Sequence, residues 1–106
     1  MPAPTTVWLG TDTYVRLTFK DVKTGDPITN ATVTVTIFDD ASGVQNGAAI
    51  NLAHLANGLY EGMIAYNRAG LLVGQRLRIR YFADGGTNRR ATDDLKAVVR
   101  VRNAMS

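Results

Sequence analysis

Residues 24–39 read TGDPITNATVTVTIFD, a turn sequence followed by strongly β-forming Thr-Val repeats. Gly25 accepts a positive φ and Pro27 has a fixed φ, so the first part of the stretch predicts a turn. From Ala31 to Asp39, small or branched apolar residues alternate with three threonines and then Phe38. This is the period-two pattern of a strand with one buried face. Branched side chains favour such a pleated, half-buried surface. The stretch therefore predicts a turn that leads into a strand.

The same alternation continues on both sides of this stretch, and no window has the period of an amphipathic helix. Turn residues rich in Gly, Asn and Asp separate the alternating segments. Strands are expected at residues 6–9, 13–20, 31–39, 58–66, 75–83 and 92–102, with a short one near 48–52. The rest of the segment 44–57 is expected to be loop. About seven short strands at this spacing are typical of a β-sandwich.

Two motifs carry a family resemblance. One is Gly25-x-Pro27-Ile-x-x-Ala31 followed by alternating valines, and the other is Gly58-x-Tyr60-x-Gly62. With the turn and strand of residues 67–80, they resemble immunoglobulin-like and prealbumin-like domains of bacterial surface proteins and phage virions. The resemblance covers most of residues 13–102. It implies one immunoglobulin-like sandwich of about seven antiparallel strands over residues 1–106, with short flexible termini at 1–5 and 103–106. Tyr60 is expected to fill the core while its hydroxyl reaches an edge.

Length and composition agree with one small domain without cross-links. A chain of 106 residues has room for a single core, and it contains no cysteine for a disulfide, a thiolate nucleophile or a thiolate metal site. The N-terminus MPAPTT lacks the basic and apolar regions of a secretory signal. No apolar run approaches the ~20 residues of a membrane span. These features predict a protein that is made in the cytoplasm and does not enter a membrane.

The residue types that carry catalysis are scarce. His54 is the only histidine, and the two serines, Ser42 and Ser106, do not lie in a nucleophile motif. The adjacent acids Asp39-Asp40 and Asp93-Asp94 are expected to diverge, the first pair in a turn. We therefore expect no catalytic residue, no cofactor and no metal ligand, although a calcium ion held between loops stays open. The chain is predicted not to be an enzyme.

The charges are unevenly distributed along the chain. Residues 1–61 carry a net charge of −3 and residues 62–106 a net charge of +6. Alternation places three arginines on one face of the strand 75–83 and three cations on one face of the strand 92–102. These six residues are Arg76, Arg78, Arg80, Lys96, Arg100 and Arg102. If the two strands pair, the like charges need an offset: acids on a neighbouring strand, solvent and salt, or an anionic partner.

Exposed apolar residues are the second candidate for an interface. By alternation, Phe38 and Val98 lie on the outer sides of their strands, and Trp8 lies near a polar terminus. One interpretation is that these side chains are covered locally. The other is a subunit interface, where aromatic residues and Arg are enriched. The candidate partner interface is therefore Trp8, Phe38 and the six cations.

Two functions are compatible with these observations. The first is a structural or assembly protein, such as a head decoration, head–tail or tail-associated subunit of a phage or prophage virion. It would assemble in the host cytoplasm with other protein subunits, as a homo-oligomer or in a larger assembly. The alternative is a carbohydrate- or ligand-binding adhesion module that uses exposed aromatics such as Tyr14 or Tyr66. Nucleic acid is the less favoured partner of the basic strands, because aromatic side chains should be interleaved with the arginines, and of the nearby Tyr81 and Phe82 the former is expected to point inward.

Overall fold

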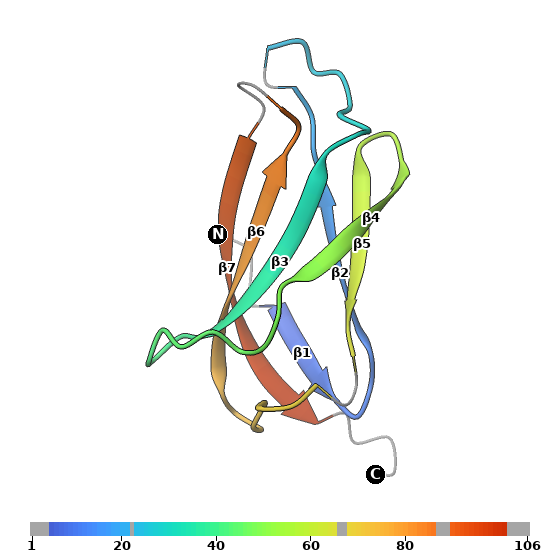
Figure 1. Cartoon of the computed structure of the whole chain (residues 1–106). Helices are drawn as coiled ribbons and strands as arrows, with labels where there is room; N and C mark the ends of the chain where they lie inside the picture. The colour runs from blue at the N-terminus through green and yellow to red at the C-terminus, as the bar shows by residue number, and fades with distance from the viewer. Residues whose placement is uncertain (1–4, 22, 66–67, 87–89, 102–106) are drawn as a thin grey trace.

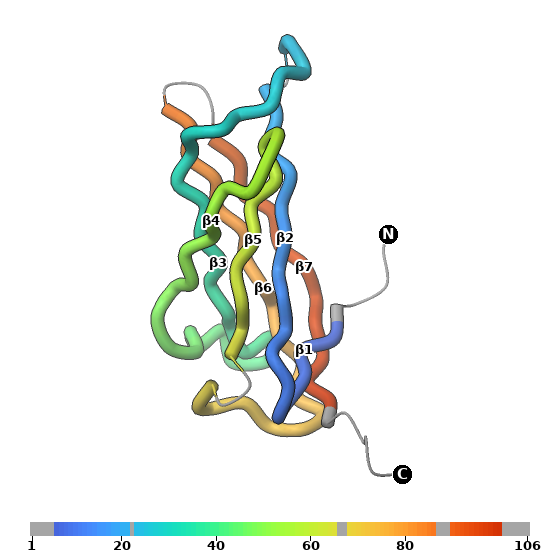
Figure 2. Tube along the Cα trace, turned by 90° about the vertical axis from the view of Figure 1, so that its right-hand side faces the viewer, coloured from blue at the N-terminus to red at the C-terminus, as the bar shows by residue number. Residues whose placement is uncertain are grey.

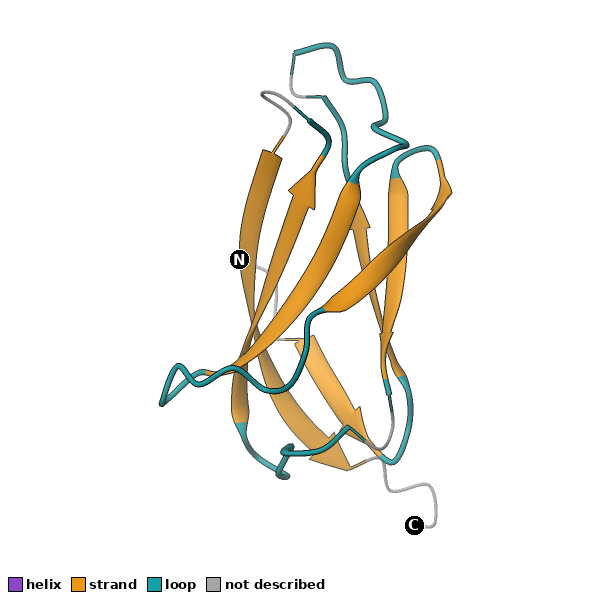
Figure 3. Ribbon diagram, viewed as in Figure 1, coloured by secondary structure: helices purple, strands orange, loops and turns teal. Residues whose placement is uncertain are grey.

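The computed structural model describes residues 5–21, 23–65, 68–86 and 90–101, and within these ranges the chain is all-β without a helix. The termini expected to be flexible lie outside these ranges, except for Thr5, which begins the first strand. Figure 1 shows the strands, and Figure 3 shows that the described segments between them are turns and loops. They are β1 Thr5–Leu9, β2 Thr13–Thr18, β3 Thr32–Asp39, β4 Ile50–Ala56, β5 Leu59–Ile64, β6 Arg76–Asp84 and β7 Arg90–Val101.

The strands form one sheet in the order β1-β7-β6-β3-β4-β5-β2. Strand β4 lets this sheet fold back on itself, because its first half pairs with β3 and its second half with β5. The strands at the two ends of the order, β1 and β2, are consecutive in the chain, so the sheet is nearly closed. Figure 2 shows β2 and β5 in front of β6 and β7.

The expectation of purely antiparallel strands is wrong for β1. This strand runs parallel to β7, from Thr5 opposite Ala97 to Leu9 opposite Val101. The short turn after Leu9 has to deliver the chain into β2 on the other side of the molecule, and this requirement sets the direction of β1. Alternation of apolar residues specifies which face of a strand is buried but not which way the strand runs.

The expectation for residues 44–57 is also corrected. The strand in this segment begins at Ile50 and continues to Ala56, where a loop was expected. Asn57 and Gly58 then reverse the chain with φ values of 52° and 81°. Asn-Gly with both residues in the left-handed region is the preferred two-residue hairpin turn. The dipeptide therefore joins β4 directly to β5, with an irregularity in pairing between His54 and Ala56.

The core lies between the two halves of the sheet and contains mainly inward-facing strand residues, together with Ile28 and Leu71 from loops. Val35, Ile37, Leu77, Ile79 and Val99 are all fully buried. Tyr60 is 1% exposed, which confirms its expected place in the core. Its hydroxyl donates to the Ile28 carbonyl at 2.7 Å and accepts from the Ala31 amide at 3.0 Å. Both of these groups belong to the turn before β3, so Tyr60 ties that turn to the core.

Candidate partner-binding surface

Strands β6 and β7 pair antiparallel, as the prediction of a shared basic face required. Arg78 lies opposite Lys96, and Arg76 lies opposite Val98. Strand β3 adds Phe38 beside Arg78, and β1 adds Trp8 beside Arg100. The described residues of the predicted interface therefore lie together on four adjacent strands, β1, β7, β6 and β3. Arg102 lies outside the described residues.

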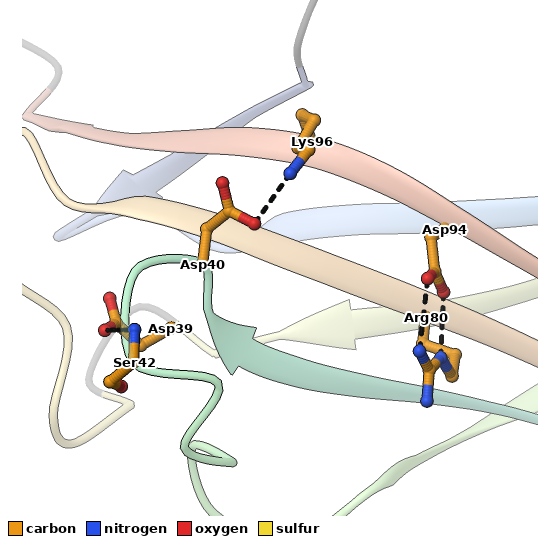
Figure 4. Close-up of polar contacts among 6 residues, drawn as sticks. All are labelled: Asp39, Asp40, Ser42, Arg80, Asp94 and Lys96. Atoms are coloured by element: carbon orange, nitrogen blue, oxygen red, sulfur yellow. Dashed lines mark hydrogen bonds and ion pairs between the residues drawn. The ribbon is translucent and has the colours of Figure 1, made fainter.

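Acids on neighbouring elements neutralise two of these cations (Figure 4). Arg80 forms a two-pronged contact with Asp94, Nε to Oδ1 at 2.9 Å and Nη2 to Oδ2 at 3.2 Å. Lys96 Nζ lies 2.7 Å from Oδ1 of Asp40, which follows β3. The hydrogen bond from Arg80 lowers the pKa of Asp94, and the charges of Arg80, Arg78 and Lys96 add to this effect. Neighbouring acids are therefore one of the offsets that the like charges needed.

Phe38 is half-buried beneath two arginines and is not a free aromatic surface. The guanidinium carbons of Arg78 and Arg80 lie 5.4 Å and 5.3 Å from the centre of its ring. Such cation–π contacts hold the planar guanidinium groups in place over the ring. The Nε atom of Arg78 is buried and has no hydrogen-bond partner in the described part of the chain. Of the two interpretations of Phe38, the structure supports local covering.

The remaining two cations are exposed, and no described residue forms an ion pair with either of them. Arg76 and Arg100 line a groove of about 640 Å³ on the outer face. Its other lining residues are Thr6, Asp40, Leu77, Lys96, Ala97 and Val98. Three cations thus face one carboxylate, and that carboxylate is already bound to Lys96. We call this concavity the basic groove. It leaves positive charge available to an anionic group from outside.

Hydrogen bonds between two loops hold one end of the basic groove in place. Asp39 accepts from the Ser42 amide at 3.0 Å (Figure 4) and from Gln75 Nε2 at 3.2 Å. The Ser42 side chain lowers the pKa of Asp39 most, and the hydrogen bonds from Gln75 and from the Ser42 amide lower it further. Next to these residues, the Asp40 amide donates to the Arg76 carbonyl at 3.0 Å. The backbone beneath Asp40 and Arg76 is therefore ordered without a partner.

The predicted surface did not include Asp94, Asp40 and Thr6. Asp94 could have been included, because it has the same parity as Lys96 on one strand and must share its face. Asp40 and Thr6 could not, because they reach the basic groove only through strand order. The direction of β1 and the turn after β3 place them there.

The structure gives no binding site to the other residues that the sequence analysis singled out, namely His54, the adjacent acids and the exposed tyrosines. His54 lies in β4, not in a loop, and its Nε2 accepts from the Gly58 amide at 3.1 Å across the hairpin turn. Asp39 and Asp40 diverge to different partners, which confirms that they do not form a carboxylate pair. Tyr14 is 60% exposed and lies opposite Met63, not another aromatic residue. Tyr66 lies outside the described residues. The described ranges contain no cluster of three or more His, Cys, Asp or Glu that could hold a metal ion.

Comparisons with known proteins add no relative from which a function could be transferred. No protein-family model, curated protein or solved structure matches the chain. Among the described residues there is no helix able to cross a membrane. The function therefore has to be inferred from the surface itself.

Proposed function

We propose that the chain is an immunoglobulin-like β-sandwich that works as a non-enzymatic assembly module and binds protein partners through the basic groove. The observation that carries this proposal is that Arg76 and Arg100 are exposed in a preformed concavity without an ion-pair partner among the described residues. Arginine is the residue best suited to ion pairs at interfaces, because its planar group binds carboxylates in a bidentate manner. The two packed halves of the sheet and the Tyr60 bridge support the sandwich assignment.

The chemistry of the basic groove favours an acidic protein segment over a nucleic acid. Single-stranded nucleic acids are bound by stacking on aromatic side chains. Phe38 cannot serve in this way, because Arg78 and Arg80 lie over its ring. Buried Leu77 and Ala97 and half-buried Val98 add apolar lining, which suits a polypeptide.

Titration of the protein with a short glutamate-rich peptide tests this proposal. We expect saturable binding that weakens with salt, and the double variant Arg76→Glu/Arg100→Glu should bind about tenfold less tightly or worse. The matched control is Lys20→Glu/Lys23→Glu, which reverses two exposed charges away from the groove and should leave the affinity unchanged. A labelled oligonucleotide forms the comparison arm. Equal losses in both double variants, or tighter binding of the oligonucleotide through Arg76 and Arg100, would contradict an acidic protein partner.

The setting that we propose is a phage or prophage virion, in which the module decorates the head or joins head or tail components. The support for this setting is the resemblance carried by residues 25–31 and 58–62 and the absence of cysteine. The test is to purify virus particles from a culture that produces the protein and to quantify the protein by mass spectrometry. A constant number of copies per particle is expected. Particles without the protein would contradict the setting but not the role of the basic groove.

A further inference from the structure

Strand β7 is much longer than the strand that covers its outer edge. It runs from Arg90 to Val101 and pairs with β6 over nine positions, from Val98 back to Arg90. On its other side β1 pairs only with Ala97–Val101. Figure 1 shows β1 beside the lower part of β7 alone. Residues 90–96 therefore form a sheet edge with which no described strand pairs.

The hydrogen-bonding direction of this edge follows from Val99. The Val99 amide donates to the Gln75 carbonyl at 2.9 Å, and its carbonyl accepts from the Gly74 amide at 2.7 Å. Backbone groups of successive residues in a strand point to opposite sides in the sheet. The odd-numbered residues of β7 therefore bond toward β6, and the N–H and C=O groups of Arg90, Thr92 and Asp94 point away from it.

The first part of β7 is also exposed on both of its faces. Ala91 and Asp93 have the parity of the buried residues Ala97 and Val99, yet residues 90–94 are all exposed. The other half of the sheet thus does not cover this part of the strand. Unpaired edges of this kind accept a further strand from another chain, a common mode of protein recognition.

From this geometry we infer that residues 90–94 of β7 pair antiparallel with the same residues of a second copy, with Thr92 opposite Thr92 at the two-fold axis. In this register Arg90 of each copy lies opposite Asp94 of the other. Three residue pairs then exchange backbone hydrogen bonds, and two of them bring opposite charges together on the outer face. An interface of one surface with itself is the most common kind in homo-oligomers.

Charge complementarity favours this register over those with the axis shifted to residue 93 or 94. Shifting the axis to residue 93 places Arg90 opposite Lys96, which repels. Shifting it to residue 94 places Asp94 opposite Asp94, which repels as well. Arg90 bonds Asp84 and Asp94 bonds Arg80 within the chain, and all four groups remain partly exposed. The intermolecular contacts would extend these pairs into one network.

The test is native mass spectrometry and light scattering of single variants and of their mixture. Arg90→Glu alone and Asp94→Lys alone each place like charges opposite one another, so each should weaken self-association about tenfold or more. Mixing the two variants places the introduced glutamate of one chain opposite the introduced lysine of the other and keeps one original Asp94–Arg90 contact. The heterodimer should therefore form with nearly wild-type affinity. A folding defect in either variant cannot be repaired by mixing, so restored association reports the pairing itself.

Two further variants make the result specific to the edge. Thr92→Pro removes an N–H that points away from β6, so the variant should remain folded and should lose the dimer. Arg100→Glu, in the basic groove, should leave the dimer intact, which separates this inference from the proposed function. A wild-type protein that stays monomeric up to millimolar concentration would overturn the inference. Failure of the variant mixture to associate more tightly than either variant alone would overturn it as well.

Discussion

At the residue scale, the charge that the outer face of β6 and β7 offers to a partner depends on which of its cations already have an acidic partner within the chain. The sequence shows six cations on two strands, but their number does not reveal how much positive charge is available to a partner. Asp94 and Asp40 bind Arg80 and Lys96, and the Phe38 ring lies beneath Arg78 and Arg80. The partner of Arg80 could be predicted from the parity of Asp94 on its strand. The partner of Lys96 could not, because Asp40 comes from a turn 56 positions away.

The pH dependence of stability is a prediction at this scale. Hydrogen bonds lower the pKa of Asp39, most strongly the bond from the Ser42 side chain. Bonds from Gly86 and Arg80 lower the pKa of Asp84 and Asp94 respectively. A carboxyl whose pKa is lower in the folded state stabilises the fold above the unfolded pKa of about 4. This contribution is lost as the pH falls through the folded pKa. Thermal unfolding should therefore show a constant midpoint at neutral pH and a decline below about pH 4.

Asp39→Asn provides the control for this prediction. The variant should be less stable than the wild type at neutral pH, and the difference should shrink as the pH falls below about 4. Asp26→Asn, in an exposed turn, should behave like the wild type at every pH. If the stability difference for Asp39→Asn were the same at acidic and neutral pH, the carboxylate would not be the source of the effect.

At the element scale, the alternation of apolar and polar residues predicted where most strands lie and which residues they bury. It did not predict the end of β4, which a turn sets, or the direction of β1. Strands β2, β3 and β6 each overlap the expected range closely, because one face of each is buried, and β7 has such a buried face only in its second half. The range of β4 was missed although Asn57-Gly58 marks its end, because Leu55 interrupts the regular pairing and hides the pattern. Nothing in the five residues of β1 indicates that this strand runs parallel to its neighbour.

Two glycine substitutions test how tightly the β4–β5 hairpin packs. Gly58 has a φ of 81°, and a Cβ there would lie 2.6 Å from the Phe19 carbonyl oxygen. Gly74 has a similar φ of 84° but no atom within 4 Å of such a Cβ. Alanine in the left-handed region costs about 1–2 kcal/mol at either position. Gly58→Ala should cost clearly more in urea unfolding, because it also forces Phe19 away. Equal losses in the two variants would mean that the hairpin does not pack tightly on the end of β2.

At the scale of the whole molecule, one pair of strands carries two separate surfaces. The basic groove lies where β1 covers β7, and the open edge lies where β1 does not. The sequence predicted the presence of a basic face, because alternation alone places its arginines. It did not predict the groove or the edge, since both follow from the short, parallel β1 and its position at the end of the sheet.

An NMR titration with a glutamate-rich peptide shows where the partner binds, and we propose that it binds in the basic groove. A chain of 106 residues is well suited to amide-resolved spectra. We predict that the amide signals that shift most belong to Arg76, Leu77 and the segment 96–100, and that none of these shifts occurs in Arg76→Glu/Arg100→Glu. Shifts that cluster elsewhere, for example around Lys20 and Lys23, or shifts that persist in the double variant, would contradict the claim.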